Sequence, residues 1–138
     1  MKKIIIGIAG LAFLASCKKI SSDDVSTTLE DGTWVITQFE EDGINETSKF
    51  SGYSFDFMDN GTVTASKDTI SVNGTWSIGE ESDDDNPKHL ELNLSFPVID
   101  PLDELIDDWH IDERTDTKIE LKDDNDNGDD DRLTFTKS

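Results

Sequence analysis

Residues 89–96 read His-Leu-Glu-Leu-Asn-Leu-Ser-Phe, and this stretch decides the fold. Apolar side chains occupy every second position from Leu90 to Phe96, and polar side chains occupy the positions between them. Successive side chains of a β-strand point to opposite faces of its sheet, so strict alternation indicates a strand with one buried face. The stretch therefore predicts a half-buried strand near residues 88–96.

The same period of two recurs on both sides of this strand. Apolar pairs at this spacing are Trp34 and Ile36, Phe55 and Phe57, Trp76 and Ile78, Trp109 and Ile111, Ile119 and Leu121, and Leu133 and Phe135. Together they predict about eight strands, near residues 32–40, 50–58, 61–67, 70–79, 88–96, 108–113, 116–122 and 131–137. The connections are mostly short and turn-rich, which favours an antiparallel meander, and closure into a barrel would remove exposed edges. The expected fold class is all-β, a small closed barrel.

Two local signals lie between the strands. Asp59-Asn60-Gly61 is typical of a hairpin turn. Asp100 can cap a helix and Pro101 suits the first helical position, so we expect one short helix near residues 101–106. Its apolar side chains could close an open barrel end, either as a structural plug or as a lid over a ligand mouth.

The N-terminus has the features of an export signal. Lys2 and Lys3 precede an apolar run over residues 4–15, which is shorter than the roughly 20 residues of a transmembrane helix. Leu14-Ala15-Ser16-Cys17 resembles the lipobox of bacterial lipoproteins. The resemblance implies a signal peptide at residues 1–16, cleavage before Cys17, and a lipid anchor on that cysteine.

We expect three segments along the chain: the signal peptide at 1–16, a lipidated cysteine and flexible tether at 17–28, and a barrel domain at 29–138. Cys17 is the only cysteine, so the domain has no internal disulfide. In enteric lipoproteins, whose lipobox this N-terminus resembles, an aspartate after the cysteine indicates retention in the inner membrane. Lys18 occupies that position here, so the resemblance favours the outer membrane. Ser21-Ser22-Asp23-Asp24 resembles the acidic signal of surface lipoproteins of Bacteroidetes, which favours the cell surface slightly over the periplasmic face.

The chain is strongly acidic, with 32 acidic and 12 basic residues and a net charge of −20. Loss of residues 1–16, which hold two of the lysines and no acid, would bring the charge to −22. Such a field repels nucleic acid and attracts cations or basic partners, although surface acids also serve simply to keep a domain soluble. We expect no nucleic-acid partner.

A sequence echo connects three strands. Gly32-Thr33-Trp34-Val35-Ile36 recurs as Gly74-Thr75-Trp76-Ser77-Ile78, and Asp108-Trp109-His110-Ile111 keeps its Trp-x-Ile part. We expect the three tryptophans to enter one core, with the residues that follow them facing outward.

The Gly32-x-Trp34 opening, the eight strands and the lipobox together resemble the lipocalin-like domains of Bacteroidetes lipoproteins, over most of residues 29–138. The resemblance implies that Gly32 permits a tight turn into the first strand. It also implies that Trp34 closes the barrel floor beneath a basic side chain from near the last strand. Arg132 is the nearest candidate, but the alternation that places Leu133 inside directs Arg132 outward.

Catalytic groups are few. His89 and His110 lie far apart in sequence and are interpreted as surface or strand residues, and no nucleophile-elbow or phosphate-binding glycine motif is present. We expect no enzyme activity, with a hydrolase as the least favoured class of function.

One acidic run partly matches a calcium loop. Asp123, Asn125 and Asn127 occupy alternating positions before Gly128, but the twelfth position is Thr134, where a glutamate would be needed. A solvated hairpin turn is the favoured interpretation, with weak calcium binding as the alternative and no other cofactor.

An eight-stranded barrel is just wide enough to be filled by its own side chains or to hold one small ligand. The sequence therefore leaves two functions open for a monomeric, membrane-anchored domain. One is a binding module for a small apolar ligand or a protein partner. The other is a structural envelope component with a filled barrel.

Overall fold

The computed structural model describes residues 21–81, 89–124 and 129–138. The predicted signal peptide, Cys17, Asn125 and Asn127 lie outside the described residues. The helices in chain order are α2 (Ser22–Glu30) and the 3₁₀ helices η1 (Thr47–Phe50) and η2 (Leu102–Leu105). The strands are β1 (Trp34–Glu41), β2 (Ile44–Asn45), β3 (Ser54–Phe57), β4 (Thr62–Lys67), β5 (Ile70–Glu81), β6 (His89–Ser95), β7 (Asp107–Arg114), β8 (Lys118–Asp123) and β9 (Asp131–Lys137).

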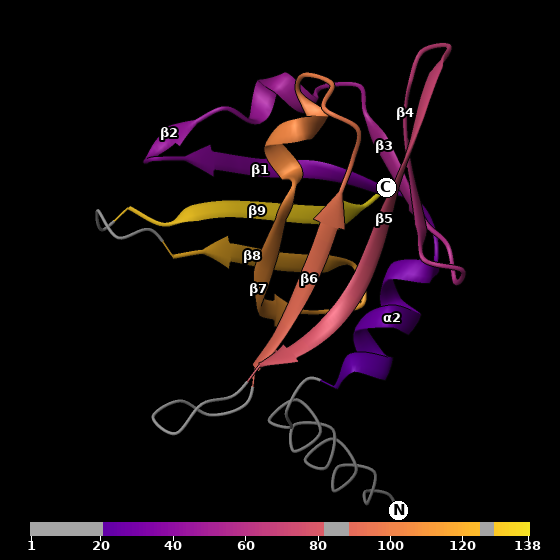
Figure 1. The fold of residues 1–138 in the computed structure, drawn as a ribbon, viewed down its shortest axis with the longest axis vertical. Helices are drawn as coiled ribbons and strands as arrows, with labels where there is room; N and C mark the ends of the chain where they lie inside the picture. Colours follow the sequence, from indigo (N-terminus) through magenta and orange to yellow (C-terminus); the bar gives the residue numbers. More distant parts are fainter. Residues whose placement is uncertain (1–20, 82–88, 125–128) are drawn as a thin grey trace, which may run out of the picture.

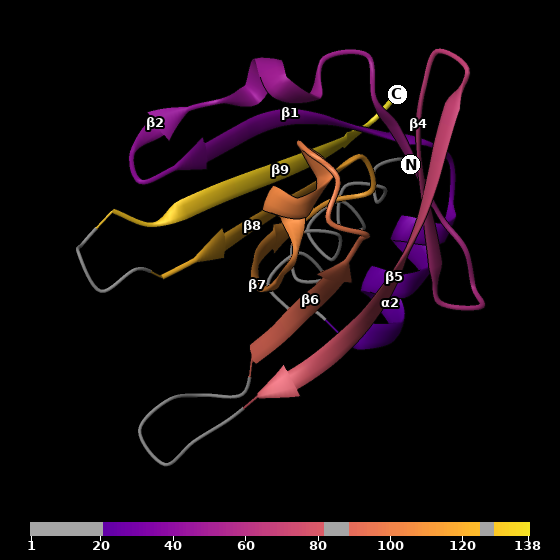
Figure 2. The same ribbon diagram turned by 45° about the horizontal axis from the view of Figure 1, so that its top comes forward.

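The long strands form an antiparallel meander that closes on itself, as the sequence predicts (Figures 1 and 2). From β3 to β9 each strand pairs with the next, and β1 pairs with β9 from Trp34 opposite Lys137 to Glu40 opposite Arg132. Strands β1 and β3 pair only briefly, with Trp34 opposite Phe55. Strand β2 is a two-residue extension that pairs with the end of β1.

The alternation seen in the sequence places the predicted apolar side chains inside. Strand β6 alternates between half-exposed His89, Glu91 and Asn93 and buried leucines. In β1 the register against β9 shifts between Ile36 and Gln38, so Ile36 and Phe39 both enter the core although they are three residues apart.

The hairpin between β3 and β4 forms where the sequence predicts it. Gly61 has φ +89°, Met58 N donates to Thr62 O at 2.8 Å, and Thr62 N donates to the side-chain oxygen of Asn60 at 3.0 Å. A left-handed backbone at Gly61 costs glycine little, which explains the residue choice.

The expected flexible tether is wrong from Ser22 onward, because residues 22–30 form α2, which packs against β3 and β5. The hydroxyl of Ser21 caps the helix by accepting from Asp24 N at 3.1 Å. Val25 and Leu29, one helical turn apart, are fully buried. The prediction of a flexible tether over residues 17–28 overlooks this i, i+4 apolar pair.

Two further expectations need correction. The strand expected at 50–58 covers only Ser54–Phe57, since Phe50 ends η1 and packs edge-on against Phe39. The helix expected near 101–106 is the 3₁₀ helix η2, and Pro101 rather than Asp100 is its N-cap, without a side-chain hydrogen bond. Its two leucines are fully buried, as a structural plug requires.

Candidate functional site

Aromatic rings fill the middle of the barrel. Phe135 contacts Phe55 and Phe57 edge-on, with ring centroids 5.3 and 5.5 Å apart, and Phe57 contacts Trp76 at 5.6 Å. Towards η1, Phe39 contacts both Phe50 and Trp109. These contacts run from one strand to the next across the interior and occupy the space in which a barrel of this size would hold a ligand.

All three tryptophans of the echo are buried, as predicted. Each indole also donates to a backbone carbonyl outside the sheet: Trp34 to Leu29 of α2, Trp76 to Met58 of the β3–β4 turn, and Trp109 to Leu105 of η2, at 2.9–3.0 Å. A buried N–H needs such a partner. The tryptophans therefore fasten three surface segments to the barrel.

A basic side chain lies against Trp34, as the lipocalin resemblance predicts, but it belongs to Lys137 and not to Arg132. The ammonium of Lys137, on β9, lies 5.4 Å from the ring centroid of Trp34 and pairs with Asp31 at 3.0 Å. Gly32 has φ +88°, and a Cβ there would press against the Lys137 stem. Arg132 of β9 is instead paired with Glu40 on β1 and with Lys122 on β8.

Gly74 has a different role from Gly32. It lies within β5, and a Cβ there would overlap the carbonyl of Ser95 and the ring of Phe96. The glycine allows β6 and the segment after it to approach β5 closely. A hollow of about 430 Å³ lies over this region, with Gly74, Ser95 and Phe96 in its lining.

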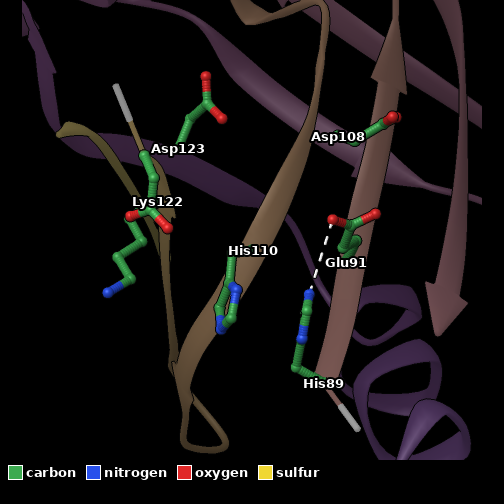
Figure 3. Close-up of a pocket in the computed structure, with 7 residues that line it drawn as sticks. His89, Glu91, Asp108, His110, Lys122 and Asp123 are labelled. Atoms are coloured by element: carbon green, nitrogen blue, oxygen red, sulfur yellow. Dashed lines mark ion pairs between the residues drawn. The ribbon is translucent and has the colours of Figure 1, made fainter. Parts of the chain in front are cut away.

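A second hollow, of about 390 Å³, lies on the outer face of β6, β7 and β8, and we call it the histidine pocket (Figure 3). Its lining residues are His89, Glu91, Asp108, His110, Lys122, Asp123 and Asp124. The register explains the grouping, because Glu91 is paired with His110 across β6 and β7, and His110 with Lys122 across β7 and β8. The sequence analysis interprets both histidines as surface or strand residues and does not bring them together.

The two imidazole rings stack in this pocket, with centroids 4.3 Å apart and planes inclined by 17°. His89 Nε2 lies 3.8 Å from Glu91 Oε2. Burial, the neighbouring His89 and the charge of Lys122 lower the pKa of His110, while Asp112 and Asp124 act in the opposite direction. The lowered pKa favours the neutral form of the His110 imidazole.

Asp123 is the one calcium-loop candidate within the described residues. Burial, a hydrogen bond with Asp107 and the charges of Asp107, Asp131 and Asp124 raise the pKa of Asp123 to about 7. A carboxyl that shares a proton with a neighbour is in an environment with excess negative charge.

A separate carboxylate cluster lies at the end of β1. Glu41, Glu46 and Glu104 bring ligand oxygens within 4.8 Å of one another, and Lys49 contacts Glu46 and Glu104 at 3.0 Å each. Burial, a hydrogen bond with Glu104 and nearby like charges raise the pKa of Glu41 to about 7. The lysine already neutralises part of this cluster, and the sequence interpretation did not identify it.

Comparison with known proteins bears on the fold. No family model and no curated protein matches this chain. The barrel is similar to a solved structure. That structure is a DUF4847 family protein from Bacteroides vulgatus ATCC 8482, with 15% sequence identity and a TM-score of 0.50, and the match covers 83% of this chain and 97% of the other. At this identity the likeness supports the small antiparallel barrel and carries no activity across.

The described helices, in residues 21–81, 89–124 and 129–138, all fall short of the length and hydrophobicity of a membrane-spanning helix.

Proposed function

We propose that this protein is an outer-membrane lipoprotein, anchored by lipid on Cys17, whose barrel is a non-enzymatic binding module for a protein partner. The observation that carries the proposal is the filled interior. Because aromatic side chains occupy the centre of the barrel, a partner is bound by the outer surface. The histidine pocket is the part of that surface we assign to binding.

The sequence leaves open a small apolar ligand or a protein partner, and the geometry favours the protein partner. A small apolar ligand needs an apolar cavity of several hundred Å³, whereas the histidine pocket is lined by imidazole, carboxylate and ammonium groups. A protein partner with a basic or polar surface suits that lining and the net charge of −20. The export, the outer-membrane location and the preference for the cell surface rest on residues 1–24 of the sequence.

The anchor is tested with Cys17→Ser in the full-length chain. Lipid on the cysteine should carry the wild-type protein into the detergent-rich phase on phase separation, whereas the variant should stay uncleaved or partition with water. Ser16→Ala, which keeps a small residue before the cysteine, is the matched control and should behave as wild type. Identical size and partitioning of Cys17→Ser and wild type would overturn the anchor.

Binding is tested with a photo-crosslinking residue in place of Asp112, an exposed position two residues after His110 on β7. A discrete protein adduct is expected from position 112 in intact cells. Ile70, which is 61% exposed at the start of β5, supplies the control position, where no adduct of that size is expected. The filled interior also suits the structural envelope role, and the absence of any adduct from position 112 would favour that second candidate.

A further inference from the structure

The two histidines of the chain meet in one pocket, although 20 residues separate them. The sequence contains only these two histidines, and the barrel register stacks their rings. Glu91 is a neighbour of both histidines. It lies two residues after His89 on the same face of β6, and it is directly paired with His110 on β7. Directly paired side chains on one sheet face lie within contact distance.

The spacing of His89 and Glu91 suits a bridging ion better than a hydrogen bond. Their Nε2 and Oε2 atoms are 3.8 Å apart, beyond hydrogen-bond length. Nitrogen and oxygen ligands of one tetrahedral Zn²⁺ lie at about 2.0–2.2 Å from the ion, which places them about 3.4 Å from each other. The observed separation exceeds that value by only a few tenths of an ångström.

We propose that His89, Glu91 and His110 form a binding site for a divalent transition-metal ion of the Zn²⁺ type. The ligand atoms of these three residues do not all lie within 4.8 Å of one another in this structure, so the site forms when His110 rotates its ring out of the stack towards His89 and Glu91. Two imidazole nitrogens and one carboxylate oxygen are a ligand set that such ions prefer over Ca²⁺ or Mg²⁺, which take oxygen ligands. The site lies in the histidine pocket that the proposed function assigns to a protein partner, and it adds a metal ion as a second ligand of that pocket.

The surroundings of the three ligands favour a cation. Asp108 and Asp123 line the same hollow and contribute negative potential around it. Lys122 is the opposing charge, and in Figure 3 its side chain extends away from the two rings.

The test is a calorimetric titration of the full-length chain with Zn²⁺ alone, with imidazole NMR signals followed in parallel. Wild type should bind one ion, and both sets of imidazole signals should move together on its addition. His110→Gln and His89→Gln should each weaken binding by at least about tenfold. Without metal, each variant should unfold at the wild-type temperature, and Zn²⁺ should raise that temperature mainly in wild type.

A matched control removes carboxylates elsewhere. The double variant Glu46→Gln and Glu104→Gln takes two charges from the other acidic cluster and should bind Zn²⁺ within about twofold of wild type. Equal titration curves for wild type and His110→Gln would overturn the site, as would zinc binding that moves no imidazole signal. Equal competition by Ca²⁺ would also overturn it. The crosslink from position 112 is also measured after a chelator has removed metal ions. Loss of zinc binding with the crosslink intact contradicts only the metal site, whereas loss of the crosslink with zinc binding intact contradicts only the protein interface.

Discussion

At the scale of single residues, identical short motifs have different roles in this barrel. Gly32 and Gly74 both stand two positions before a buried tryptophan. Gly32 adopts a left-handed backbone ahead of β1, whereas Gly74 makes room for a neighbouring segment. The motif therefore marks where a tryptophan enters the core, and the local packing decides why the glycine is needed.

A prediction follows for Gly74. Gly74→Ala should destabilise the protein by about 1–3 kcal/mol, because the added methyl overlaps the Ser95 carbonyl and the Phe96 ring and forces the strands apart. Gly79→Ala is the matched control in the same strand. Its Cβ would lie 3.2 Å from the terminal amide of Asn93, a flexible group, so its effect should stay within about 0.5 kcal/mol. Urea unfolding measures both, and equal effects would show that Gly74 is not a point of close approach.

At the scale of elements, α2 is a structural part of the barrel. Its buried face of Val25, Thr28 and Leu29 covers β3 and β5. The Leu29 carbonyl accepts from the Trp34 indole, and the Thr28 hydroxyl accepts from Arg114 of β7 at 2.9 Å. These contacts link the segment that follows the predicted anchor to the first and seventh strands.

We predict that loss of this contact weakens the whole domain. Leu29→Ala should cost about 2–5 kcal/mol, since a fully buried leucine leaves a cavity between helix and sheet. Thr27→Ala, at an exposed position of the same helix, should stay within about 0.5 kcal/mol. Denaturant titration provides the comparison. If Leu29→Ala instead increased proteolysis of the N-terminal segment without changing barrel unfolding, α2 would be an independent appendage.

At the scale of the whole molecule, excess negative charge makes stability depend on pH. Glu41 and Asp123 have pKa values raised to about 7, from ordinary values of 4.5 and 3.8. Between about pH 4 and pH 7 the folded state therefore holds protons that the unfolded chain has released. Stability contributed by these groups is greatest at the acidic end of this window and falls as pH rises through it.

The expected result is a melting temperature that is higher near pH 5 than at pH 8. The double variant Glu41→Gln and Asp123→Asn should be more stable than wild type at pH 8 and should lose most of that advantage near pH 5, because the amides carry no charge at either pH. Thermal unfolding across pH 4.5–8 measures this. The double variant Asp59→Asn and Glu30→Gln, at two exposed positions, controls for the loss of two negative charges alone. An equal gain for the double variant at both pH values would contradict the raised pKa values.

The sequence by itself determined the strands, because alternation with a period of two is a local property that burial of one sheet face imposes. It also determined that Trp34, Trp76 and Trp109 enter the core, and that a hairpin forms at residues 59–61. Its limits appear at α2, since a nine-residue helix is unstable by propensity alone and forms because the barrel buries its one apolar face.

Only the tertiary structure decided which distant residues meet. Lys137 covers Trp34 because β9 closes on β1 in that register, and neither alternation nor spacing reveals the register of closure. His89 and His110 stack for the same reason, through the pairing of β6 with β7. The interior, too, is filled only once rings from different strands come into contact. The positions of the strands follow from neighbouring residues along the chain. The contact of Lys137 with Trp34, the histidine pocket and the aromatic core follow instead from the strand pairings that form when the barrel closes.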